Sequence, residues 1–67
     1  SKTVTAYEKF KEMENNSKDG LVDRDEFVKE LVNTDKYREG EAEKMFQSMA
    51  DTGQIYNVKN NFYRKVR

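Results

Sequence analysis

The sequence predicts a small α+β domain in which three helices precede a C-terminal β-hairpin, and three observations predict it. Three successive segments carry apolar residues at helical spacing. Residues 54–67 are instead rich in β-branched and aromatic side chains, which favour strands. The chain has only 67 residues. A chain of this size forms one domain with a modest core, because folding buries only about 60% of its unfolded surface.

The composition excludes several function classes. Thirteen basic residues balance 13 acidic ones, whereas an autonomous nucleic-acid binder usually has a basic excess. Cysteine and histidine are absent, so disulfides, thiolate zinc sites and the commonest general base are excluded. We expect no enzymatic activity, cofactor, resident metal or membrane span. We expect residues 1–67 to be one domain excised from a larger protein, because a starting Met is missing.

The helices are predicted from apolar residues three or four positions apart. Thr5 followed by Glu8 is compatible with a capping box in the first helix. Asp23 is the expected N-cap of the second helix, and Gly53 is placed to end the third. The three stripes consist of Ala6, Tyr7, Phe10 and Met13, of Phe27, Val28, Leu31 and Val32, and of Ala42, Met45, Phe46 and Met49.

The tail is predicted to form strands near 54–58 and 62–66. Asn60 and Asn61 lie between them, and asparagine tolerates positive φ in a tight turn. Apolar residues also stand four apart in this tail, which permits a helix, but the composition favours strands.

Leu21 and Val22 follow Gly20 and can add a short third strand, which would stabilise a hairpin that is marginal by itself. We expect most of the core to consist of Phe10, Met13, Phe27, Leu31, Met45, Phe46, Met49, Ile55 and Phe62.

Three helices with a C-terminal hairpin resemble the winged-helix family, a helix-turn-helix variant in which the hairpin is the wing. Segments 41–46, 53–56 and 62–66 resemble the C-terminal winged helix of archaeal minichromosome maintenance (MCM) helicases. In that group a third helix runs through a glycine into an Ile-Tyr strand, and an aromatic-basic strand returns. Here Asn60-Asn61 stands where that family often has a glycine or proline turn.

The resemblance implies that residues 1–67 are an accessory domain excised from the C-terminus of a DNA replication helicase. The ATPase and the unwinding would belong to the rest of the parent chain. This domain would modulate the motor through contacts with it or with other replication proteins. The resemblance also implies a cytoplasmic location, associated with the nucleoid if the protein is archaeal.

The charges predict which part of a winged helix contacts DNA. The last helix of a helix-turn-helix unit enters the major groove, but residues 38–51 carry four acidic and two basic residues, a formal −2. Residues 57–67 carry no acid. We expect the wing to make weak, non-specific phosphate contacts without base reading. An interpretation of equal weight is that these cations only form a solvated face and bind nothing. The wing cations are Lys59, Arg64, Lys65 and Arg67.

Residues 15–26 also resemble an EF-hand calcium loop, with Gly20 at the sixth position. The first two ligand positions are neutral, which weakens calcium binding. A second loop centred on Gly53 would place Lys59 at the final ligand position, where a carboxylate belongs. The alternative function is therefore a module that holds one Ca²⁺ in loop 15–26. Its ligands would be the side chains of Asn15, Ser17, Asp19, Asp23 and Glu26 and the carbonyl of Leu21.

Overall fold

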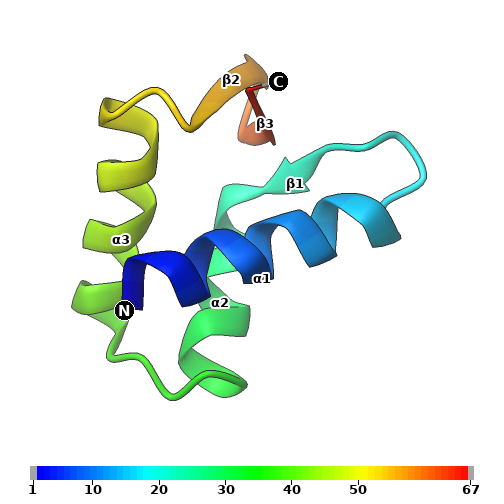
Figure 1. Cartoon of the computed structure of the whole chain (residues 1–67). Coiled ribbons are helices and arrows are strands. Elements are labelled where there is room, and N and C mark those ends of the chain that lie inside the picture. Colours follow the sequence, from blue (N-terminus) through cyan, green and yellow to red (C-terminus); the bar gives the residue numbers. More distant parts are fainter. Residues whose placement is uncertain (1, 67) are drawn as a thin grey trace.

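The computed structural model describes residues 2–66, with side chains described from Thr5 onward. Over this range the chain forms three helices and one antiparallel sheet, which confirms the predicted α+β winged-helix arrangement (Figure 1). The elements are α1 (Lys2–Asn16), β1 (Val22–Asp23), α2 (Arg24–Asn33), α3 (Glu39–Asp51), β2 (Ile55–Lys59) and β3 (Phe62–Lys65). None of the described helices is both long and apolar enough to cross a bilayer.

The sheet has the strand order β1-β3-β2, so the returning strand of the hairpin lies in the centre. β1 contributes two residues, with Val22 opposite Tyr63 and Asp23 opposite Phe62. The predicted third strand is therefore present, one residue later than expected. Leu21 stays outside it because its N–H donates to the Asp19 carboxylate at 3.2 Å and not to a neighbouring strand.

The hairpin turns at Asn60 and Asn61, as predicted. Asn60 has φ +46°, in the left-handed region that asparagine tolerates. A register shift between Asn57 and Lys59 leaves Val58 as a bulge, and its side chain is exposed.

Two of the three predicted helix boundary signals are confirmed. Asp23 caps α2 by accepting a hydrogen bond from the N–H of Asp25 at 2.9 Å. Gly53, with φ +80°, follows the end of α3. The capping box of Thr5 and Glu8 is wrong, because α1 begins at Lys2 and Thr5 lies inside it. The residues before Thr5 include no glycine or proline that would stop the helix from extending.

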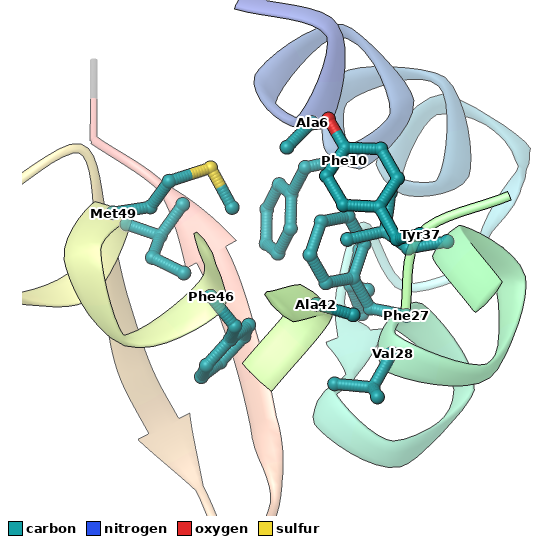
Figure 2. Packing of buried hydrophobic residues seen from close by; sticks show 11 residues of the cluster. Ala6, Phe10, Phe27, Val28, Tyr37, Ala42, Phe46 and Met49 are labelled. Atoms are coloured by element: carbon teal, nitrogen blue, oxygen red, sulfur yellow. The ribbon is translucent and has the colours of Figure 1, made fainter. Parts of the chain in front are cut away.

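The core joins all three helices to the sheet (Figure 2). A row of aromatic rings runs through it: Phe10 to Phe27 at 5.3 Å, Phe27 to Phe46 at 5.9 Å and Phe46 to Tyr63 at 4.7 Å between ring centroids. Its buried members are Ala6, Phe10, Val22, Phe27, Val28, Leu31, Tyr37, Ala42, Phe46, Met49 and Ile55.

Three residues predicted for the core are only partly buried. Met13 and Met45 pack against the cluster from outside. Phe62 is opposite Asp23 in the ladder, on the sheet face that points away from the core. Strand alternation explains this position, because Tyr63 takes the place against the helices.

Candidate nucleic-acid interface

The sheet separates an inner face, packed on the helices, from an outer face. Residues directly opposite each other in antiparallel strands point to the same side, and successive residues alternate. Ile55 is 2% exposed, whereas its neighbour Tyr56 is 47% exposed. Tyr56 is opposite Arg64. Tyr56, Phe62 and Arg64 therefore define the outer face.

The structure divides the predicted wing cations between the two faces. Lys59 is exposed at the end of β2 and is opposite Phe62, so it belongs to the outer face with Arg64. Lys65 is opposite Ile55, on the inner side at the end of β3, and is partly buried. Arg67 lies outside the described residues.

Hydrogen bonds from the helices hold the wing in place. The N–H of Lys65 donates to the Glu14 carboxylate of α1 at 2.8 Å. The N–H of Arg24 donates to the carbonyl of Asn61 at 2.9 Å, and the Asn61 side-chain amide donates to Asp23 at 2.9 Å. The wing is thus attached to α1 and to the start of α2.

One side chain closes the turn itself. The amide of Asn57 donates to the carbonyls of Asn60 at 2.9 Å and Phe62 at 3.1 Å. Sequence reasoning missed both Asn57 and Glu14. An asparagine three residues before a turn is a weak local signal, whereas nothing local connects Glu14 with a strand fifty residues later.

The wing cations form no ion pair within residues 5–66, but one acidic residue lies near them. Ion pairs in residues 5–66 join Lys9 to Glu12, Lys11 to Glu8 and Arg24 to Asp25, and no wing cation takes part. Asp19 nevertheless lies close enough to Lys59 for the lysine charge to act on it. The pKa of the Asp19 carboxyl is lowered mainly by the hydrogen bond from the Ser17 hydroxyl, then by the N–H of Leu21, with a smaller contribution from Lys59. The basic end of the wing therefore has one acidic neighbour.

The exposed surface of α3 is less suited to phosphate. Glu39, Glu43 and Asp51 are exposed there beside Lys44. The Gln47 amide, which elsewhere could read a base, donates to the Asp51 carboxylate at 2.9 Å. This surface keeps the acidic character that the sequence predicts for it.

The structure has no second EF-hand around Gly53, because residues 55–65 form a hairpin where the second EF-hand requires a helix. Within loop 15–26, the Asp23 carboxylate caps α2 and binds Asn61. Asp19 accepts from the Ser17 hydroxyl at 2.7 Å. Over the part of the chain that the structure describes, no three acidic side chains are grouped to hold a metal ion. Calcium binding by the single loop stays a prediction with little geometric support.

Comparison with protein-family models, curated proteins and solved structures found no match for this chain. The functional argument therefore depends on the fold, on the placement of charge and on the exposed side chains of the wing.

Proposed function

We propose that this chain is an accessory winged-helix domain of a DNA replication helicase, and that its wing makes weak, non-specific contacts with the DNA backbone. One observation carries the DNA contact: the hairpin carries Lys59 and Arg64 on its outer face and Lys65 at the end of β3, whereas the exposed surface of α3 is acidic. The resemblance of segments 41–46, 53–56 and 62–66 to archaeal MCM helicases supports the helicase context.

The wing cations act on phosphate as charges and do not read sequence. Lysine is a point charge, and arginine adds a fork that can bind two phosphate oxygens. Few such contacts give low affinity, so the domain cannot hold a helicase on DNA alone. Its role is to modulate the motor through contacts with the motor domain or with other replication proteins, while ATP hydrolysis takes place in the parent chain.

Fluorescence anisotropy with a labelled DNA duplex tests the backbone contact. If three phosphates are neutralised, affinity should fall about 40-fold between about 50 and 200 mM salt. A triple variant, Lys59→Gln/Arg64→Gln/Lys65→Gln, should lose measurable binding. Lys44→Gln on α3 is the matched control and should not weaken binding. Binding that is independent of salt, or unchanged in the triple variant, contradicts the proposal.

The helicase role is tested on the parent protein. We expect the rate of DNA unwinding to change when the domain is deleted and to return towards the original rate when the domain is restored. An unwinding rate that does not respond to the deletion contradicts this part of the proposal.

A further inference from the structure

We propose that the outer face of the sheet stacks on unpaired bases, so that the wing prefers single-stranded DNA to a bare phosphate backbone. The inference rests on the proposed function in one respect: the wing cations must contact DNA phosphates. It adds a second type of contact, between an aromatic side chain and a base.

The first observation is the position of the exposed apolar residues. Among the residues with described side chains, the large hydrophobic ones that remain exposed are Tyr56, Val58 and Val66, at 47%, 44% and 45%. All three lie on the hairpin or directly after it. The core does not use them, so these apolar side chains remain available for contact on or directly after the hairpin.

The second observation is the register of the hairpin. Tyr56 and Arg64 are direct cross-strand partners on the outer face, so their Cβ atoms are about 5 Å apart. Lys59 and Phe62 are the next partners on the same face. Each of these two cross-strand pairs therefore joins one aromatic and one cationic side chain.

The third observation is the electrostatic environment of this face. No acidic residue occurs from Asn57 onward. Asp23 of β1 is opposite Phe62, but its carboxylate is engaged by the N–H of Asp25 and the amide of Asn61. Asp19 also lies near Lys59 and partly offsets its charge. Arg64, directly opposite Tyr56, is therefore the main cation that this face offers to a phosphate.

Single-stranded DNA satisfies both requirements of this surface. Its phosphates complement Lys59 and Arg64, and its unpaired bases offer flat faces to the ring of Tyr56. Duplex DNA hides the faces of its bases within the stack. Proteins that bind single strands without sequence preference combine aromatic platforms and cations in this way.

The test compares two ligands that share a backbone. A labelled oligothymidylate of about twelve nucleotides and an abasic oligomer of the same length are titrated at low salt. We expect the oligothymidylate to bind roughly 5- to 100-fold more tightly, because each stacked base adds that much affinity. Tyrosine ring signals of Tyr56 should shift upfield only with the oligomer that carries bases.

The matched variants are Tyr56→Leu and Tyr56→Phe. Leucine keeps an apolar side chain but removes the ring, so it should abolish most of the preference and leave abasic binding unchanged. Phenylalanine should retain the preference. Circular dichroism checks that both variants are folded, which is expected because Tyr56 is outside the core.

The outcomes separate the two proposals. Equal binding of both oligomers, or an undiminished preference in Tyr56→Leu, overturns the inference and leaves the backbone contact intact. Absence of binding to either oligomer overturns the proposed DNA contact together with the inference. An acidic peptide could also bind this face. If the affinity for the peptide depends on Tyr56 and the affinity for the oligothymidylate does not, the face serves a protein partner and the inference is wrong.

Discussion

At the scale of single residues, Asp23 connects two parts of the domain through one carboxylate oxygen. That oxygen accepts the N–H of Asp25 and the side-chain amide of Asn61, both at 2.9 Å. We expect Asp23→Ala to lower the free energy of unfolding in urea by about 1–2 kcal/mol, because both the helix cap and the link to the wing are lost.

Glu26→Gln is the control for Asp23→Ala. Glu26 is exposed in the first turn of α2 and should contribute only a few tenths of a kcal/mol through the helix dipole. Combining Asp23→Ala with Asn61→Ala should cost less than the sum of the two. Equal effects of Asp23→Ala and Glu26→Gln would show that the carboxylate has no connecting role.

Asp19 provides a test by pH. Its pKa is lowered in the folded state, chiefly because the Ser17 hydroxyl donates to the carboxylate. The charged form therefore contributes stability above the unfolded pKa of about 4, and this contribution is lost as the pH falls through the lower folded value. Carbon-13 NMR should give an Asp19 midpoint below the ordinary aspartate value. Ser17→Ala should raise the midpoint more than Lys59→Gln does, and the reverse order would contradict the assignment.

At the scale of elements, replacing either of two glycines by alanine should change the stability of the fold, in opposite directions for the two positions. Gly53 follows α3 with φ +80°, and a Cβ there would meet no atom within 4 Å. Gly53→Ala should therefore destabilise by about 1 kcal/mol through backbone strain alone. Gly40 lies in the first turn of α3 with open space around it, so Gly40→Ala should stabilise by up to about 1 kcal/mol. Thermal unfolding of both variants measures these changes. A change in Tm of the same sign in both variants would refute the role given to Gly53.

The loop of residues 15–26 should not respond to calcium. Its two aspartates at positions 19 and 23 are already engaged in hydrogen bonds within the domain. Adding calcium and then a chelator should leave Tm unchanged, because only a ligand of the folded state raises it. A calcium-dependent rise in Tm that Glu26→Gln abolishes would support the EF-hand alternative instead.

The elements could be predicted where local chemistry decides the structure. The β-branched and aromatic tail, Asn60 at the turn and Asp23 at the helix start each carry a local signal that the structure confirms. The capping box predicted at Thr5 and Glu8 lies inside α1, because the same residue pattern also occurs within helices. The bulge at Val58 has no such signal, since it depends on the register between strands.

The candidate site was predictable only in its composition. The charges of the wing follow from the sequence, but the separation of Lys65 from Arg64 depends on strand alternation around the observed register. The approach of Asp19 to Lys59 and the contact of Glu14 with β3 join residues far apart in the chain. Such tertiary contacts leave no pattern in a single sequence.

At the scale of the whole molecule, Phe27 connects the parts of the core. Its ring contacts Phe10 of α1 and Phe46 of α3, and it is fully buried. Phe27→Ala should cost about 3–5 kcal/mol, a large share of the roughly 3–10 kcal/mol available to a domain of this size. Circular dichroism should show a largely unfolded or strongly destabilised chain. Tyr56→Ala is the exposed aromatic control, and a comparable loss there would contradict this view of the core.

The most direct test of the account is an NMR titration of the labelled domain with duplex DNA at low salt. The account predicts that the amide signals of Lys59, Arg64 and Lys65 shift progressively, and that the shifts disappear when salt is raised. Signals of the exposed α3 residues Lys44 and Gln47 should stay in place. Shifts centred on α3, with the wing unaffected, would contradict the central claim that the hairpin is the part of this domain that contacts DNA.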